Sequence, residues 1–242
     1  MTRRVLVTGA AKRLGRRFAL HLAARGFDVA VHAHTSRVEA EGVADAIRAS
    51  GRRACTVFAD LRDESAIGSA VESAVAALGG LDTLVLSASS FPPDAVDTLD
   101  GSTFLDTLRV NTVGPFLFAR AARAHLMRAK PGRIVVLGDV HASRPLGGFL
   151  AYSAAKAALA SVTQSLARAF APDITVNAIL PGSVLPPEDF DANALERLRA
   201  RTPTGRLGSP EDLLPVLDFL IDAPAQLTGV SIPVDGGRSI AP

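Results

Sequence analysis

The chain lacks the residues and segments on which several classes of protein depend. Cys55 is the only cysteine among 242 residues, which excludes an intrachain disulfide and a cysteine-based metal site. No apolar run approaches the ~18 residues that a membrane span needs, so we expect no membrane partner. Tryptophan is absent, and Tyr152 is the only tyrosine. Hydrophobic residues make up 48% of the chain and charged residues 21%, a balance typical of a folded globular protein.

The chain also lacks an excess of charge of either sign. Lysine and arginine total 26 and aspartate and glutamate 24, and no basic block runs beyond three residues. A nucleic-acid-binding face is far more basic, so we expect no nucleic-acid partner. The first residues faintly resemble a signal peptide, but Lys12 and Arg13 interrupt the apolar stretch too early for one. We therefore expect a cytoplasmic protein.

Short apolar runs rich in β-branched residues alternate with amphipathic segments from end to end. Leu14, Phe18 and Leu22, for example, recur at helical spacing after the first run. Alternation of this kind predicts an α/β fold, in which helices cover both faces of a parallel sheet. We expect residues 1–242 to form one domain. The predicted strands are Arg4–Thr8, Val29–His32, Ala54–Phe58, Thr83–Ser87, Arg133–Leu137, Thr175–Ile179 and Ser231–Val234.

Two stretches interrupt this alternation. Residues 87–100 contain Phe91 followed by two prolines. Residues 181–210 are long, rich in proline and acidic at Glu188, Asp189 and Asp191. Long excursions inside a compact domain are often functional lids, and we expect residues 182–209 to form a substrate loop. A variable surface loop is the alternative.

A glycine-rich segment stands at the first junction of strand and helix, where Thr8–Gly15 reads TGAAKRLG. Glycine at such a turn lets the backbone approach a pyrophosphate, which the N-terminus of the following helix attracts. A simple tight turn is the alternative. Arg13 stands where the usual fingerprint has its middle glycine, so the loop is less permissive but gains a cation beside the phosphates.

The end of the second strand indicates which nicotinamide cofactor binds. An NAD site places an acid there to hold the ribose hydroxyls, but residues 32–37 read HAHTSR and the first acid beyond them is Glu39. Hydroxyls, imidazoles and Arg37 suit a 2′-phosphate, so we predict NADPH. His32 and His34 could instead be polar residues of the strand without a role in binding.

Two residues after the third predicted strand are further candidates for the nucleotide site. Asp60 and Leu61 follow that strand directly, at the edge where an adenine would lie. Asp60 could equally cap the next helix.

Tyr152 and Lys156 are the strongest catalytic candidates. They stand four residues apart in a helical segment and so share a face. A nearby ammonium favours tyrosinate and lowers the pKa of the phenol, which makes the pair a plausible proton donor to a substrate that takes up hydride. A surface pair at helical spacing is the alternative, although the chain has only one tyrosine and three lysines.

Two further residues lie in positions that suit the same site. Asp139 follows the fifth predicted strand, thirteen residues before Tyr152, at the edge where parallel sheets bind ligands. Capping of the following turn is its alternative role. Asn111 precedes Pro115 by four residues, so in a helix its carbonyl loses its partner and can hold a water; a simple kink is the alternative.

With these motifs in place, the whole chain resembles the short-chain dehydrogenase/reductase family. The resemblance rests on Thr8–Gly15, Asn111, the Tyr152/Lys156 pair, Pro181-Gly182 and the Asp-Gly-Gly of residues 235–237. It implies a single Rossmann-like doubly wound parallel sheet of about seven strands, with helices on both faces. It also implies hydride transfer with a nicotinamide cofactor, with Tyr152 as acid and Asn111 anchoring a relay water. It implies that Lys156 lowers the pKa of Tyr152 and holds the nicotinamide ribose. Tetramers are common in the family, so we expect a homotetramer.

Two departures from the family pattern narrow the resemblance. The family usually has serine where Asp139 stands, and Asn-Asn-Ala-Gly where residues 86–91 read LSASSF. Both departures are similar to the pteridine reductases and the bacterial dihydromonapterin and dihydrofolate reductases, in which a phenylalanine stacks on the pterin. One of their phosphate-binding positions, often arginine, is Thr35 here, so NADPH binding would depend on Ser36, Arg37 and the histidines.

The residues and the resemblance together predict an NADPH-dependent reductase of a small molecule, a pterin or folate. An NADPH-dependent carbonyl reductase, such as a 3-oxoacyl-thioester reductase, is the alternative, and a cofactor-binding sensor without turnover is a third. We expect no metal ion. The predicted catalytic residues are Asn111, Asp139, Tyr152 and Lys156; the cofactor-binding residues are Gly9, Lys12, Arg13, Leu14, Gly15, His32, His34, Thr35, Ser36, Arg37, Asp60, Leu61, Ser87, Ala88, Ser89, Tyr152, Lys156, Pro181, Gly182 and Ser183; the substrate-binding residues are Arg13, Ser89, Phe91, Asp139 and Tyr152.

Overall fold

All seven predicted strands are present in one parallel sheet. The computed structural model describes residues 2–185 and 191–241, and its strands lie in the order β3-β2-β1-β4-β5-β6-β7. The predicted bounds differ from the observed ones by two residues at most. The strands are β1 (Arg4–Val7), β2 (Asp28–Ala33), β3 (Ala54–Phe58), β4 (Thr83–Leu86), β5 (Gly132–Leu137), β6 (Ile174–Pro181) and β7 (Ser231–Val234).

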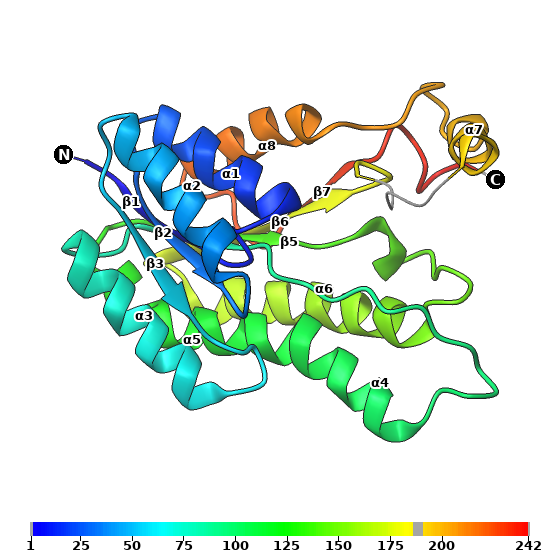
Figure 1. Ribbon diagram of the computed structural model, residues 1–242, viewed down its shortest axis with the longest axis horizontal. Coiled ribbons are helices and arrows are strands. Elements are labelled where there is room, and N and C mark those ends of the chain that lie inside the picture. Colours follow the sequence, from blue (N-terminus) through cyan, green and yellow to red (C-terminus); the bar gives the residue numbers. More distant parts are fainter. Residues whose placement is uncertain (1, 186–190, 242) are drawn as a thin grey trace.

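Helices cover both faces of the sheet, as predicted, and give the molecule three layers (Figure 1). One face carries α1 (Arg13–Ala24), α2 (Arg37–Ala49) and α8 (Pro210–Asp222). The opposite face carries α3 (Glu64–Leu78), α4 (Gly101–Leu108), α5 (Gly114–Leu126) and α6 (Leu150–Phe170). A short π-helix, Arg109–Val113, joins α4 to α5, and a 3₁₀ turn, Val140–Ala142, follows β5.

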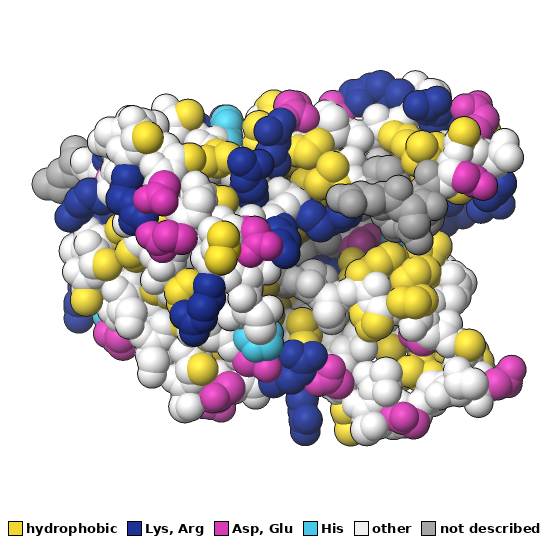
Figure 2. All heavy atoms as spheres, in the orientation of Figure 1, with side chains coloured by type: hydrophobic (Ala, Val, Ile, Leu, Met, Phe, Trp, Pro, Cys, Tyr) yellow, Lys and Arg dark blue, Asp and Glu magenta, His cyan; other side chains and the backbone are white. Residues whose placement is uncertain are grey.

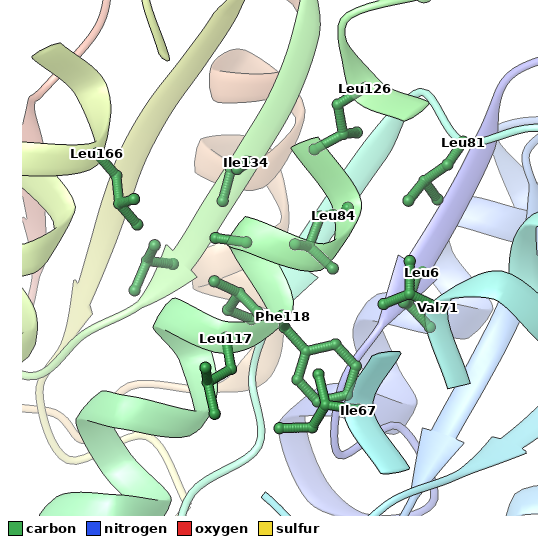
Figure 3. Packing of buried hydrophobic residues seen from close by; sticks show 14 of the residues in the cluster. Leu6, Ile67, Val71, Leu81, Leu84, Leu117, Phe118, Leu126, Ile134 and Leu166 are labelled. Carbon is green, nitrogen blue, oxygen red and sulfur yellow. The ribbon is translucent and has the colours of Figure 1, made fainter. Parts of the chain in front are cut away.

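The strands are apolar on both sides because each strand feeds two cores. On β1, Leu6 packs toward the layer of α3 and α5, whereas Val5 and Val7 pack toward α1 and α8. This is the two-residue period of a strand with both faces covered. Figure 3 shows the first core, in which Phe118 of α5 lies close to Ile67 of α3.

The site lies where the strand order reverses, between β1 and β4. Crevices at such a reversal, outside the carboxyl ends of the strands, are where open α/β sheets bind ligands. Thr8, which is buried directly after β1, joins the two strand ends there. Its Oγ1 accepts hydrogen bonds from the backbone N–H groups of Ser87 at 2.9 Å and Ala88 at 3.1 Å. The loops that follow the strands extend to the right in Figure 1.

Residues 181–210 differ from the loop that the sequence suggested. They contain a helix, α7 (Ala192–Ala200), and Asp191 caps it by accepting the backbone N–H of Ala194 at 2.6 Å. The sequence did not predict this helix, because proline and acidic residues are typical of loops. Asp191, one of these acids, is instead the N-cap of the helix. Glu188 and Asp189 lie outside the described residues. Within 2–185 and 191–241, no helix is both long and apolar enough to cross a membrane.

Candidate active site

The glycine-rich turn is packed so tightly that two of its positions require glycine. Gly9 has a φ of +65°, and a Cβ there would lie 2.7 Å from the Cα of Ala88. A Cβ on Gly15 would lie 2.2 Å from the carbonyl oxygen of Gly9. Arg13 also adopts a positive φ, +51°, so it takes the left-handed conformation that the family usually gives to glycine. Its guanidinium donates to the carbonyl of Leu185, which joins the turn to the segment after β6.

The N-terminus of α1 is suited to a phosphate. The first N–H groups of an α-helix have no partner inside the helix and carry a partial positive charge. Lys12 is the N-cap residue and makes no side-chain cap, so its side chain does not satisfy these donors. Leu14 packs partly buried on the core behind the turn. The turn is therefore suited to a pyrophosphate, the role that the sequence predicts for it.

His32 supports this turn instead of facing a ligand. Its side chain is 1% exposed; its Nδ1 accepts the backbone N–H of Gly9 at 3.2 Å, and its Nε2 lies 3.1 Å from the carbonyl oxygen of Ala59. Because a carbonyl only accepts, Nε2 carries the proton and the ring is neutral. Burial lowers the pKa of His32 to about 4. The predicted contact with a 2′-phosphate is therefore wrong for His32, which is a polar residue of the strand that positions Gly9.

The remaining residues of this segment do face solvent around the start of α2. His34 is half exposed, and its Nε2 lies 3.6 Å from Oδ2 of Asp60. Ser36 is the N-cap of α2, but its side chain makes no capping hydrogen bond. The Arg37 guanidinium lies over the Phe58 ring at 4.1 Å, and Thr35 is exposed.

The two candidates after β3 lie in different surroundings. Asp60 accepts hydrogen bonds from Arg62, and Asp63, not Asp60, is the N-cap of α3. The alternative role of Asp60 as the cap of this helix is therefore wrong. Leu61 is 7% exposed and belongs to the core; a Cβ on Gly114 would lie 2.7 Å from the Leu61 Cβ. Leu61 can therefore contribute little side-chain surface to an adenine.

The structure brings Asp139, Tyr152 and Lys156 together. The Tyr152 hydroxyl donates to Oδ2 of Asp139 at 2.6 Å. Oδ1 of Asp139 accepts the backbone N–H of His141 at 2.8 Å, so the carboxylate caps the 3₁₀ turn, which is the alternative role considered for it, while it also contacts Tyr152. The Lys156 Nζ donates to the Leu137 carbonyl at 3.1 Å and lies 5.5 Å from the centroid of the Tyr152 ring. All three are held by β5 and α6.

The pKa of Tyr152 is shifted in the opposite direction to the one that the sequence predicts. We expected Lys156 to lower the pKa of Tyr152, but burial and the adjacent Asp139 carboxylate raise it, and only Ser89 acts in the opposite direction. The reason is distance, since Asp139 touches the hydroxyl whereas the ammonium faces the ring. Burial lowers the pKa of Lys156 to about 8, against the attraction of Asp139. The phenol therefore stays protonated at neutral pH.

Asn111 holds the loop after β4 in place. It lies in the π-helical turn just before Pro115, so the helix accommodates this proline by widening. Its side-chain oxygen accepts from the Ser89 hydroxyl at 2.5 Å and from the Ser90 N–H at 3.2 Å. Its amide donates to the carbonyls of Ser90 and Thr107, at 3.0 and 3.1 Å. The side chain is thus fully engaged as a support for this loop.

Phe91 forms an aromatic wall beside Tyr152. The two rings pack edge to face with centroids 4.5 Å apart, and Phe149 stacks parallel on Phe91 at 4.1 Å. Phe91 remains 45% exposed. The sequence pointed to Phe91 but missed Phe149, because nothing local predicts that residues 58 positions apart stack. Figure 2 shows a hollow at the same side of the molecule, between α7 above and the layer of α4 and α6 below.

Comparison with known proteins agrees with this geometry. Residues 9–239 match the family model described as "Enoyl-(Acyl carrier protein) reductase". The chain is 33% identical to "Short-chain dehydrogenase/reductase eriH" of Hericium erinaceus, over 96% of each chain. It is 31% identical to "3-oxoacyl-[acyl-carrier-protein] reductase FabG" of Staphylococcus aureus, over 98% of each chain.

This chain belongs to the short-chain dehydrogenase/reductase family. It is therefore an oxidoreductase. Among solved structures, it is similar to "FolM Alternative dihydrofolate reductase 1" of Brucella canis, complexed with NADP. That likeness has a TM-score of 0.92 and 33% identity, and covers 99% of this chain and 94% of that one.

In this short-chain dehydrogenase/reductase, an acid outside the predicted set clasps the Phe91 loop to the catalytic helix. The Asp94 carboxylate accepts the backbone N–H groups of Leu150 and Ala151, the first residues of α6, at 2.7 and 2.8 Å. Its own N–H donates to the Gly148 carbonyl at 2.8 Å. Asp94 thus supplies from a distant loop the cap that α6 needs, and no sequence signal at its own position indicates this.

We expect Asp94→Ala to lower the free energy of unfolding by about 0.5–2 kcal/mol, the usual cost of a lost helix cap. It should also raise the KM of this short-chain dehydrogenase/reductase more than it lowers kcat, because Phe91 loses its tether while Tyr152 keeps its partners. Urea unfolding and steady-state kinetics measure the two effects. Asp97→Ala, at an exposed acid of the same loop, is the control, and equal effects from both variants would contradict the clasp.

The segments after β6 and β7 close the site on its other side. Pro181 ends β6, and the Gly182 N–H donates to the Val234 carbonyl at 3.1 Å. A Cβ on Gly182 would lie 2.8 Å from the Cα of Asp235, so glycine lets the two segments meet. The Ser183 carbonyl accepts the N–H of Gly208 at 3.0 Å, which joins both ends of residues 182–209 in this short-chain dehydrogenase/reductase.

Proposed function

We propose that the protein is an NADPH-dependent reductase that converts a dihydropterin or dihydrofolate to its tetrahydro form. The observation that carries this proposal is the hydrogen bond between the Tyr152 hydroxyl and Asp139, 2.6 Å long, beside the ring of Phe91. The likeness to the Brucella canis dihydrofolate reductase, which is complexed with NADP, supports it.

A pterin suits these groups better than a simple ketone does. It is flat and carries amino and ring N–H groups, from which a carboxylate such as that of Asp139 can accept hydrogen bonds. The half-exposed ring of Phe91 offers an aromatic face against which such a ring can stack. A ketone brings only an acceptor, and it would face the Asp139 carboxylate without a donor for it.

The residues divide the chemistry as follows. The reduced nicotinamide of NADPH supplies the hydride. Tyr152 holds its proton at neutral pH because burial and Asp139 raise its pKa, so it is a donor to the ring nitrogen that becomes basic on reduction. Lys156, 5.5 Å from the Tyr152 ring centroid, lies close enough to stabilise the tyrosinate that remains. Asn111 fixes Ser89 and Ser90 and thereby the position of Phe91.

The turn and the start of α2 fit NADPH. The N-terminus of α1, which has no side-chain cap, would hold the pyrophosphate, and Lys156 would hold the nicotinamide ribose. Ser36, with a hydroxyl that does not cap α2, and Arg37 would hold the 2′-phosphate, with His34 beside it. Residues 87–89 and 181–183 would flank the nicotinamide.

We expect the protein to bind NADPH at least tenfold more tightly than NADH. One hydrogen bond to a charged phosphate contributes ~1.5–3 kcal/mol, which is roughly tenfold or more in affinity. Calorimetric titration with each cofactor gives both dissociation constants. Equal affinities would contradict the role of Ser36 and Arg37.

A 3-oxoacyl-thioester reductase is the second candidate. The 31% identity with the Staphylococcus aureus 3-oxoacyl-[acyl-carrier-protein] reductase favours it, and Tyr152 and Lys156 would serve a ketone as well. Asp139 distinguishes the candidates, because a ketone oxygen offers no donor to its carboxylate whereas a pterin does.

Oxidation of NADPH by the wild-type protein tests the proposed function. Dihydropterins, dihydrofolate and an acetoacetyl thioester are each supplied separately, and the absorbance of NADPH is followed. We expect turnover with a dihydropterin or dihydrofolate, with the tetrahydro product identified by chromatography. Turnover of the thioester alone would establish the second candidate, and NADPH binding without any turnover would indicate a sensor.

The assembly and the loop are also proposals. We propose a homotetramer, and exposed apolar side chains on the outer helical layers, Leu105, Val113 and Phe219, are surfaces that subunits could cover. Light scattering gives the mass. We also propose that residues 182–209 cover the substrate, since Arg13 of the nucleotide turn already contacts Leu185.

A further inference from the structure

An ion pair links the nucleotide turn to the helix after β2. The Lys12 Nζ lies 2.8 Å from Oε1 of Glu39. Lys12 is the N-cap of α1, and Glu39 is in the first turn of α2. Glu39 is also the first acid after β2 in the sequence. Although it lies beyond the end of that strand, the ion pair places its carboxylate beside the glycine-rich turn. Both side chains are about half exposed, 56% for Lys12 and 46% for Glu39.

The pair borders an open surface hollow of about 600 Å³. The hollow is lined on one side by the turn and the start of α1, with Lys12, Arg13 and Arg16, and on the other by α2. Glu39 is the one acid among these lining residues. A surface with three cations attracts an anion, but the carboxylate already neutralises one of them.

We propose that Glu39 limits the preference for NADPH by competing with the 2′-phosphate for the ammonium of Lys12. This inference rests on the proposed use of NADPH. Half-exposed ion pairs contribute little net stability, so a phosphate can draw the ammonium away from the carboxylate. The carboxylate remains beside the phosphate and repels it. NADH carries a neutral hydroxyl in place of that phosphate, so Glu39 has nothing to repel when NADH binds.

Binding titrations of four variants test the proposal. Glu39→Gln keeps the size of the side chain and removes its charge, and we expect it to bind NADPH about threefold to fivefold more tightly at low salt. Its affinity for NADH should stay within about twofold. Lys12→Met should weaken NADPH binding, and the gain from Glu39→Gln should disappear in the double variant, because the competition requires both partners.

Glu41→Gln is the matched control. It removes the same charge from the same helix, but the Glu41 carboxylate pairs with Arg48 instead of Lys12. We expect no more than a small change in NADPH affinity. An equal gain from Glu41→Gln and Glu39→Gln would overturn the proposal in favour of a general effect of net charge. Weaker NADPH binding by Glu39→Gln would also overturn it, since Glu39 would then position Lys12.

These titrations test the role of Glu39 and the proposed preference for NADPH independently. If the wild type binds NADH as tightly as NADPH but Glu39→Gln shifts binding toward NADPH, the proposed cofactor preference fails and the role of Glu39 stands. If the wild type prefers NADPH and Glu39→Gln changes neither affinity, the preference stands and the role of Glu39 fails. Raising the salt concentration should shrink the gain, because half-exposed charges are screened.

Discussion

Tyr152→Phe should reduce kcat by about 10²–10⁴-fold, the usual contribution of a positioned acid or base. The substitution removes the hydroxyl that donates to Asp139 at 2.6 Å, while the ring keeps its edge contact with Phe91. Stopped-flow or steady-state oxidation of NADPH with the dihydropterin measures the loss. NADPH affinity should stay close to that of the wild type, because the hydroxyl acts on the substrate.

The variant also separates two sources of the proton. A kcat close to the wild-type value would show that the proton comes from elsewhere, with Asp139 the first group to examine. Circular dichroism and the unfolding midpoint check that α6, which carries both Tyr152 and Lys156, is intact. Removal of a buried hydroxyl together with its contact to a charged acceptor should change stability modestly, by about 1–3 kcal/mol.

Asp139→Ser should cost about tenfold to a hundredfold in kcat/KM for the dihydropterin, the effect of losing a hydrogen bond to a charged group. Serine can still cap the 3₁₀ turn, because it is a good N-cap residue, so the backbone N–H of His141 keeps an acceptor. Serine is also the usual residue of the family at this position. Activity toward a 3-oxoacyl thioester should therefore stay the same or rise.

Steady-state kinetics with both substrates measures the loss of pterin activity and any gain of thioester activity. Asp97→Ser, in the exposed part of the Phe91 loop, controls for the loss of one acid near the site. An equal loss on both substrates from Asp139→Ser would mean that the carboxylate serves the protein structure and not pterin recognition. Unchanged pterin activity would remove Asp139 from the site.

The features that the sequence predicted have a local signature. The seven strands were predictable because each is a short apolar run between segments with helical periodicity. The runs are apolar because helices cover both faces of the sheet. The Tyr152/Lys156 pair was predictable because spacing of four residues on a helix places side chains on one face. The turn at Thr8–Gly15 combines glycine with its place after the first strand, and two of its glycines fill positions where no Cβ fits.

The features that the sequence did not predict depend on contacts between distant segments. The neutral ring of His32 faces Gly9 and Ala59, and the polarity of the segment gave no sign of this. Asp94 caps α6 across 56 residues. The pKa of Tyr152 is raised because Asp139 contacts the hydroxyl directly, and a motif records which residues are present but not which atoms touch.

A competition assay tests the central claim, reduction of a pterin by the Asp139–Tyr152 pair, most directly. Equimolar dihydropterin and acetoacetyl thioester are mixed with the wild-type protein and limiting NADPH, and both products are quantified by chromatography. Their ratio gives the ratio of the two kcat/KM values. We predict that tetrahydropterin dominates by at least about tenfold, the discrimination expected of one hydrogen bond to a charged group. A product mixture dominated by the hydroxyacyl thioester would contradict the account.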